Sequence, residues 1–255
     1  MWLELEGLNN LRDLGGTPTR SRRRIRRNTL WRSDNLQDLG PAQFDQLREW
    51  GLTDVIDLRT DFEIESAPSP AEDLPGITYH HCSYFREDED DDEDILDRAL
   101  PWVDYEASVR HEDPVTASYL SFLRDRPDSV VEALEAITDA EGAALVQCAA
   151  GKDRTGFTIA LVLSLLGVSD ADIVADYART TERITAVVQR MWSTETYASE
   201  RDRELSQSAL AARPEAMQGV LDYLNREKGG VEPALVEIGW AHEDTLRLRK
   251  RLLES

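Results

Sequence analysis

A cysteine and an arginine stand six residues apart in a segment whose residue types could bind and attack an anion. Residues 147–156 read Gln-Cys-Ala-Ala-Gly-Lys-Asp-Arg-Thr-Gly, with Cys148 as the nucleophile and Arg154 as the cation. The apolar residues 143–146 predict a short buried strand before it, and residues 157–166, apolar all round, predict a buried helix after it. A thiolate held between a strand end and a helix start predicts nucleophilic attack on a phosphate ester.

The loop offers the groups that such a reaction needs. Backbone N–H groups from Ala149 to Arg154 can turn inward and donate to phosphate oxygens at the helix N-terminus. Small side chains at Ala149 and Ala150 let the backbone curl closely, and Gly151 permits a positive φ. Arg154 can hold two oxygens through its planar fork. A free thiol titrates near ~8.5, and the helix N-terminus and the nearby cation favour ionisation of Cys148.

The remaining loop residues extend this prediction. The Thr155 hydroxyl, followed by Gly156, is expected to hydrogen-bond the sulfur and help it leave when a phospho-cysteine is hydrolysed. Lys152 would add positive charge at the mouth of the pocket, suited to a multiply phosphorylated head group. Asp153 has two open interpretations: a structural one, in which it caps loop amides or orients Arg154, and a catalytic one, in which it transfers a proton.

Three other kinds of site use similar residues, and the sequence argues against each of them. A buried structural cysteine would not need the glycine and arginine that follow it. A nucleotide-binding loop is excluded because Val146 stands where its first glycine belongs and Asp153 where Ser or Thr is needed. A sulfur-transfer loop also surrounds a cysteine with amides, but the Thr155-Gly156 pair argues against it.

Strands and helices alternate along the chain and predict one α/β domain over residues 1–255. We expect a hairpin over 20–31, strands over 53–58 and 77–82, and helices over 41–50, about 95–110, 115–123 and 129–138. Ser169 opens a further helix, and the rest of the chain to 253 is helical. This order favours a short, mostly parallel sheet with helices on both faces and a site at the carboxyl edge of its strands.

The sequence resembles the atypical bacterial tyrosine and lipid phosphatases. Residues 148–156 match the family's loop, and the Asn-Leu-Arg-Asp-Leu-Gly-Gly of residues 10–16 resembles its N-terminal motif. Counterparts also exist for residues 30–33, 55–59, 173–177 and the C-terminal segment that includes Gly230 and Gly239. The resemblance implies a cysteine-phosphatase fold, activity on phosphotyrosine and often on phosphoinositides, and no metal or other cofactor.

The general acid is the least defined part of the predicted site. Asp88 is our candidate, because it lies two residues beyond the position that aligns with the family's acid when Gly76-Ile77 is used as the anchor; a solvated acidic loop over 87–94 is the alternative. Asp104 superficially resembles the acid of ordinary tyrosine phosphatases. Asp57, at the end of a predicted core strand, is expected to organise the floor of the site.

Composition limits the partners. The formal net charge of −21, from 50 acidic and 29 basic residues, argues against general nucleic-acid binding. The chain shows no signal peptide and no apolar stretch of membrane-spanning length, which predicts a cytoplasmic protein without stable membrane insertion. Its two cysteines, Cys82 and Cys148, make no disulfide framework, although an oxidative bond between them is an alternative to a buried core role for Cys82.

Two further segments carry hypotheses. Residues 20–27 include six arginines, which could contact an anionic membrane or a phosphoinositide head group; a solvated hairpin is the alternative. Residues 183–213 could form a helical lid like that of the family, although ordinary core packing would also explain Met191, Trp192, Tyr197 and Leu205.

The leading functional hypothesis is a protein-tyrosine-phosphatase-like phosphomonoesterase with possible dual-specificity or phosphoinositide activity, for which phosphate or vanadate would be a ligand. The alternative is an inactive phosphate-binding interaction module. Gln147 motivates this alternative, because the family has a histidine at that position that favours the thiolate.

Gln147 leads to a direct prediction. Glutamine can donate a hydrogen bond but carries no charge, so we expect Cys148 to ionise less readily than in a loop with histidine, yet more readily than a free thiol. The rate of inactivation by iodoacetate, measured against pH, would report this. A midpoint at the free-thiol value of ~8.5 would show that Cys148 is not activated.

Overall fold

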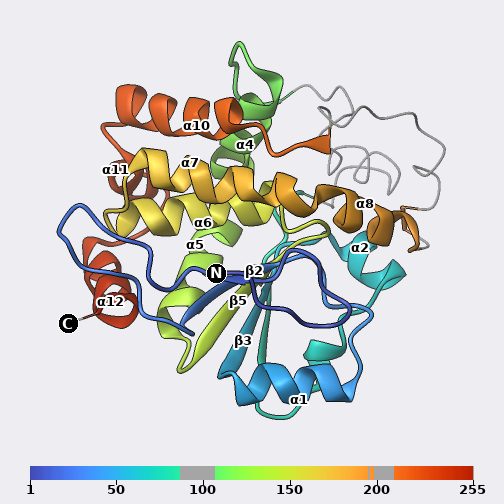
Figure 1. Cartoon of the computed structure of the whole chain (residues 1–255). Coiled ribbons are helices and arrows are strands. Elements are labelled where there is room, and N and C mark those ends of the chain that lie inside the picture. Colours follow the sequence, from blue (N-terminus) through green and yellow to red (C-terminus); the bar gives the residue numbers. More distant parts are fainter. Residues whose placement is uncertain (87–106, 195, 198–209, 255) are drawn as a thin grey trace.

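The computed structural model of the protein describes residues 1–86, 107–194, 196–197 and 210–254. Its centre is a sheet in the order β1-β2-β5-β3-β4 (Figure 1). The strands are β1 (Arg12–Asp13), β2 (Leu30–Ser33), β3 (Leu52–Asp57), β4 (Thr78–His81) and β5 (Ala143–Gln147). All neighbours run parallel except β1 and β2. The predicted mostly parallel sheet is confirmed.

Helices cover both faces of this sheet, as predicted. On one face lies α1 (Pro41–Glu49), and on the other lie α4 (Pro114–Asp125), α5 (Pro127–Asp139) and α6 (Asp153–Leu165) (Figure 1). Alternating strand residues enter different cores: Val55 and Leu145 join the cluster on the α1 side, while Ile56 and Val146 join the cluster around α6. Because successive side chains of a strand point to opposite faces, alternate residues of each strand contact the helices on opposite faces of the sheet.

The remaining helices pack around the sheet and its covering helices. The elements are α2 (Asp61–Ser66), the 3₁₀ turn η1 (Pro70–Asp73), α7 (Asp170–Ala178), η2 (Arg179–Arg183), α8 (Ile184–Trp192), α10 (Pro214–Glu227), α11 (Val231–Val236) and α12 (His242–Leu252). Helix α7 lies against α6, and α10 packs on α7 and α4 (Figure 1). Ser169 caps α7 as predicted, because its side chain accepts a hydrogen bond from the amide of Asp172 at 3.2 Å.

The predicted hairpin over 20–31 is wrong in its extent. Residues 30 and 31 belong to β2, which lies inside the sheet between β1 and β5. A smaller turn remains, in which Pro18 bridges Arg24 and the Thr19 amide donates to the Arg23 carbonyl. Leu30 and Trp31 are fully buried, and this burial places them in the central sheet rather than in a surface hairpin.

The predicted helix over about 95–110 falls mostly outside the described residues, and residues 107–110 are not helical. Within the described part of the chain, no helix is both long and apolar enough to cross a membrane.

Candidate active site

Cys148 lies directly after β5, at the carboxyl edge of the parallel strands, and α6 begins five residues later at Asp153. The predicted arrangement of strand, loop and helix is therefore present. The cysteine is buried, as are Arg154 and most of the loop. A helix of 13 residues thus starts beside the nucleophile and directs its positive end toward it.

The carbonyl groups of the loop are held on its outer side. The Asn10 side-chain amide donates to the carbonyls of Ala150 and Gly151 at 2.9 and 3.0 Å. Arg32 donates to the Gly151 carbonyl at 2.7 Å. Asn10 and Arg32 come from the segment around β1 and β2, so the N-terminal part of the chain fixes the direction in which these peptide groups point.

The amide groups of the loop remain available. The Ala149 carbonyl accepts from the Asn35 amide at 3.2 Å, which turns a third peptide group outward. Within the part of the chain that the structure describes, the amides from Ala149 to Lys152 donate to no other residue. Carbonyls bound from outside and amides left free together form an anion-binding nest.

Gly151 is required by this curvature. Its φ is +62°, and a Cβ atom at this position would lie 2.2 Å from the Ser33 carbonyl oxygen. The prediction that Gly151 supplies a positive φ is confirmed.

Asp176 neutralises the groups that hold the loop from outside. Its carboxylate contacts Arg12 Nε and Arg32 Nη1, each at 2.9 Å, and both guanidinium groups are fully buried. Burial alone would raise the pKa of Asp176, but the two arginines lower it to about 2. One carboxylate on α7 therefore stabilises two neighbouring buried cations.

Arg154 is held by Glu63, a residue that the sequence did not point to. Its Nη2 donates to Glu63 Oε1 at 2.8 Å, its Nη1 donates to Glu63 Oε2, and Nη1 also donates to the Leu58 carbonyl at 3.2 Å. Glu63 is fully buried; burial alone would raise its pKa, but Arg154 lowers it to about 2. This ion pair fixes the guanidinium beside the loop.

Glu63 also caps its own helix. The Thr60 amide donates to Glu63 Oε2 at 2.8 Å, and the Thr60 hydroxyl accepts from the Glu63 amide at 3.1 Å. The Thr-x-x-Glu spacing is a capping-box signal that could have predicted the start of α2, although not the contact with Arg154.

Helix α8 and the residue Tyr197 pack on the loop. Val187, Met191 and Tyr197 form one apolar cluster with Ala149, and the Tyr197 hydroxyl donates to Glu63. These contacts explain the apolar residues of this segment by packing against the loop. Leu205 lies outside the described residues.

Lys152 does not stand at an open pocket mouth, contrary to the prediction. Its side chain is buried, and Nζ donates to the Leu210 carbonyl at 3.0 Å. Asp153 Oδ1 lies 3.7 Å from this Nζ and accepts a hydrogen bond from Tyr119, whose hydroxyl lies 2.7 Å from that of Tyr177. The contacts of Asp153 thus favour its structural interpretation.

Gln147 faces the floor of the site. Its Nε2 donates to Asp57 Oδ2 at 2.7 Å, and the same carboxylate accepts from Tyr79 and Arg59, each at 2.8 Å. Burial alone would raise the pKa of Asp57, but the charge of Arg59 lowers it. The fully buried Asp57 therefore organises the residues beneath the loop, in line with its predicted role.

The expected hydrogen bond from Thr155 to the cysteine sulfur is not formed. Thr155 Oγ1 is buried and has no hydrogen-bond partner among the described residues. Gly156 leaves room for a neighbour, because a Cβ atom there would lie 2.8 Å from the Tyr177 ring.

Cys82 and Cys148 do not lie on neighbouring strands, and no disulfide joins them. They follow β4 and β5, which flank β3 on opposite sides. Two strand spacings separate their backbones by about 10 Å, whereas a disulfide needs Cα atoms within about 7 Å. Burial also raises the pKa of the Cys82 thiol. In this structure both cysteines are free thiols, so the oxidative bond considered from the sequence would require the two segments to approach each other.

The candidate acid Asp88 and the alternative Asp104 both lie outside the described residues. Phe85, near the start of that interval, stands with its ring 5.6 Å from the Arg154 guanidinium carbon. The chain thus enters the interval that contains Asp88 from beside the loop.

Comparisons with known proteins agree with this geometry. The model described as "Tyrosine phosphatase family" matches residues 3–254. The triple specificity protein phosphatase PtpB of Mycobacterium tuberculosis is 29% identical over 98% of this chain and 98% of its own. A protein of Cupriavidus necator named as a tyrosine-protein phosphatase is 31% identical over 71% of this chain and 63% of its own. A tyrosine-protein phosphatase of Nostoc commune is 26% identical over 87% of this chain and 73% of its own.

Replacing Glu63 by Gln tests the buried ion pair. We expect the free energy of unfolding at pH 7 to fall by about 3 kcal/mol, because Arg154 would keep an uncompensated buried charge. The pKa of Glu63 is lowered to about 2, so the contribution of the pair is complete above its ordinary value of 4.5 and is lost as the pH falls toward 2.

The measurement is urea unfolding of both proteins at pH 7 and pH 3. The exposed Glu65 on the same helix provides the matched control, since Glu65→Gln removes the same charge and should change stability little. Equal losses in the two variants, or a Glu63→Gln loss that does not shrink at pH 3, would contradict the assignment.

Proposed function

Because the chain belongs to the tyrosine phosphatase family, we propose that it hydrolyses phosphotyrosine through a covalent phospho-cysteine at Cys148. The observation that carries this proposal is the loop itself, whose carbonyls are bound from outside while its amides from Ala149 to Lys152 have no partner among the described residues. The position of Cys148 at the start of this loop supports its proposed role as the group that attacks phosphorus.

The reaction follows in two steps. The Cys148 sulfur attacks phosphorus, the bond to the tyrosine oxygen breaks, and that oxygen takes a proton from a general acid. Water then attacks the phospho-cysteine and gives a proton to the deprotonated acid, the sulfur–phosphorus bond breaks with the sulfur leaving as thiolate, and phosphate is released. In both steps the loop amides and Arg154 stabilise the negative charge on the non-bridging oxygens.

The hydrogen bonds that hold Arg154 in place support its proposed role in binding phosphate oxygens. Leu58 and Glu63 use both N–H groups of Nη1 and one of Nη2. Among the described residues, the Nε–H and the second N–H of Nη2 donate to no other group. These two donors lie on one edge of the guanidinium, which is the edge that grips two phosphate oxygens.

The remaining loop residues would bind substrate in this mechanism. Ala149, Ala150 and Gly151 supply amides, and Thr155 and Gly156 continue the turn into α6. For Thr155, the buried hydroxyl without a described partner supports a role toward the sulfur of the reacting state. The contact of Asp153 with Tyr119 supports a positioning role for that carboxylate.

We also propose a broader substrate range, including phosphoserine, phosphothreonine and phosphoinositides, with residues 183–213 as a helical lid. The name of the mycobacterial relative states triple specificity for that protein. In this chain, α8 packs on Ala149 and the Leu210 carbonyl binds Lys152. Movement of this segment would release the Lys152 charge for a second phosphate group.

Cys148→Ser tests the nucleophile. We expect hydrolysis of p-nitrophenyl phosphate by the wild type to be inhibited by vanadate and to be lost in this variant, because serine at neutral pH is not ionised. Arg154→Lys should also lose most activity, since lysine lacks the fork, while Cys82→Ala should retain it as a control. A wild type that binds phosphate without turnover would instead support the interaction module.

Asp88→Asn tests the proposed general acid. We expect a loss of about 10²-fold or more on phenyl phosphate and a smaller loss on p-nitrophenyl phosphate, whose leaving group needs less protonation. Asp92→Asn in the same acidic run is the matched control, and Asp104→Asn tests the alternative. Equal losses of Asp88→Asn on both substrates, or no loss, would remove Asp88 from this role.

A further inference from the structure

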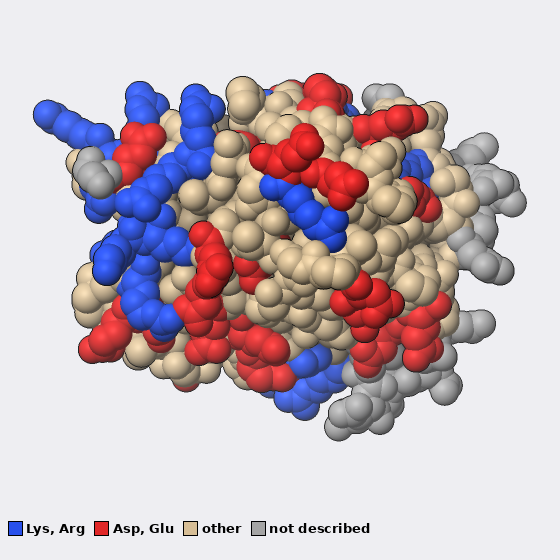
Figure 2. Space-filling view, turned by 90° about the horizontal axis from the view of Figure 1, so that it is seen from below, with Lys and Arg blue, Asp and Glu red and all other residues tan. Residues whose placement is uncertain are grey.

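A group of arginines forms a positively charged surface on this acidic chain. Its members are exposed or half-buried side chains of the turn after β1, joined by a lysine on the last turn of α12: Arg22, Arg23, Arg24, Arg26, Arg27 and Lys250. Figure 2 shows many Lys and Arg side chains gathered at one end of the molecule, with a few acidic side chains among them, while the rest of that view carries mostly acidic side chains and a few smaller basic groups. We name these six residues the distal basic face.

The charges of the distal basic face are not neutralised locally. Most arginines elsewhere in the described chain form an ion pair with a carboxylate. None of the six members does so with a described residue, although the exposed Glu254 is adjacent; only the flanking Arg20 pairs, with Asp170 at 2.8 Å. The positive charge of this surface is therefore available to an anionic partner.

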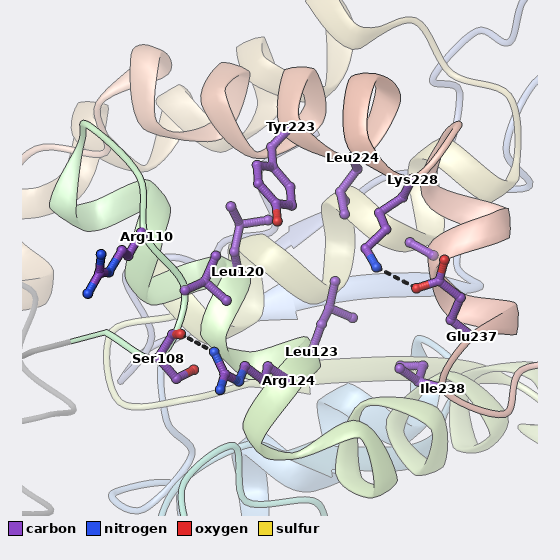
Figure 3. Close-up of a pocket in the computed structure, with 12 residues that line it drawn as sticks. Ser108, Arg110, Leu120, Leu123, Arg124, Tyr223, Leu224, Lys228, Glu237 and Ile238 are labelled. Atoms are coloured by element: carbon purple, nitrogen blue, oxygen red, sulfur yellow. Dashed lines mark hydrogen bonds and ion pairs between the residues drawn. The ribbon is translucent and has the colours of Figure 1, made fainter.

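The cations that border a pocket on another part of the protein can be compared with those of the distal basic face. A cavity of about 590 Å³ between α4, α10 and α11 is also bordered by cations (Figure 3). There, however, Lys228 pairs with Glu237 at 2.5 Å and Arg124 donates to the Ser108 carbonyl. Lys228 is thus paired with a carboxylate. No member of the distal basic face has such a partner among the described residues, although Arg23 and Arg24 donate to the backbone carbonyls of Glu254 and Gly16, each at 2.7 Å.

The distal basic face is held firmly in place. The Arg26 amide donates to the Leu252 carbonyl at 2.7 Å, and the Glu254 amide donates to the Arg24 carbonyl at 2.9 Å. Ile25 between them is fully buried. The backbone that presents the arginines is thus ordered before any partner binds, which lowers the entropy cost of binding.

This face lies at the opposite end of the molecule from Cys148. The Arg20 amide donates to the carbonyl of Gly167, just beyond the carboxyl end of α6, whereas the loop lies at the amino end of that helix. Thirteen residues at 1.5 Å each separate the two ends by about 20 Å. The arginines therefore cannot bind the head group that Cys148 would attack.

An apolar side chain accompanies the cations. Leu246 on α12 is 52% exposed, one turn before Lys250 on the same side of the helix. A lipid surface accommodates both features, since headgroup phosphates attract arginine and the boundary below them accepts leucine. Polynucleotides would satisfy the charges but offer Leu246 no comparable environment.

We propose that the distal basic face docks on an anionic lipid bilayer, with the catalytic loop facing away from it. The net charge of −21 does not prevent this, because charges more than about 8 Å apart are screened at physiological ionic strength. The local surface then decides the attraction. This inference does not depend on the proposed reaction.

Vesicle co-sedimentation of the full chain tests the proposal. In 0.1 M NaCl we expect binding to vesicles of phosphatidylcholine with phosphatidylglycerol, little binding to phosphatidylcholine alone, and release at high salt. Arg22→Gln/Arg27→Gln/Lys250→Gln should bind roughly a hundredfold more weakly. Leu246→Ser should bind severalfold more weakly.

The matched control is Arg48→Gln/Arg110→Gln/Arg124→Gln, which removes the same charge from exposed or half-buried sites on and near α1 and α4 and should bind normally. Hydrolysis of p-nitrophenyl phosphate and thermal unfolding should be unchanged in all variants. Absence of wild-type binding to anionic vesicles, or an equal loss in the control, would overturn the proposal. Equal binding to soluble heparin or duplex DNA with Leu246→Ser unaffected would assign the face to a soluble polyanion instead.

Discussion

The carboxylate of Asp176 is the interaction on which the anion-binding loop depends. Arg12 and Arg32 lie on neighbouring strands and are fully buried, so their charges would repel each other without it. With the charges balanced, Arg32 holds the Gly151 carbonyl outward, and the amides of the loop are left facing the site. Removing the carboxylate would leave two buried cations without compensation, a change that costs several kcal/mol in proteins. The catalytic loop is thus built as much by α7 and the N-terminal strands as by its own sequence.

A second buried carboxylate gives Arg154 its direction. Glu63 binds one edge of the guanidinium and leaves the other free, so a flexible side chain becomes a fixed oxyanion ligand. Asp176 and Glu63 each lie behind a cation rather than facing the phosphate position. This arrangement lets acidic residues stabilise a site that binds an anion, because the donors stand between them and the bound charge.

Much of this site could be predicted, because its chemistry is local in sequence. The strand, the turn at Gly151 and the helix follow from neighbouring residues, as does the position of Cys148. The partners of buried charges could not be predicted, because they depend on how strands and helices meet. Glu63 is recognisable from Thr60 as a helix cap, yet its contact with Arg154 joins residues 91 positions apart. The same limit applies to Lys152, whose carbonyl partner Leu210 is distant in the chain. Likewise, only the strand order shows that β3 separates Cys82 from Cys148.

Positive charge has two different forms in this acidic protein. In the loop, Arg154 and Lys152 are buried and held by partners, so their electrostatic influence is short-ranged and depends on geometry. On the distal basic face the arginines are exposed and without described carboxylate partners, so their field extends into solvent over about a screening length. An anionic surface would consequently be attracted to the end of the molecule that lacks the nucleophile. Since α6 connects the two ends as one rigid element, such attraction would orient the loop toward solvent. Phosphorylated proteins would then reach Cys148 on the docked protein, whereas a phosphoinositide head group would reach it only on protein that is not docked.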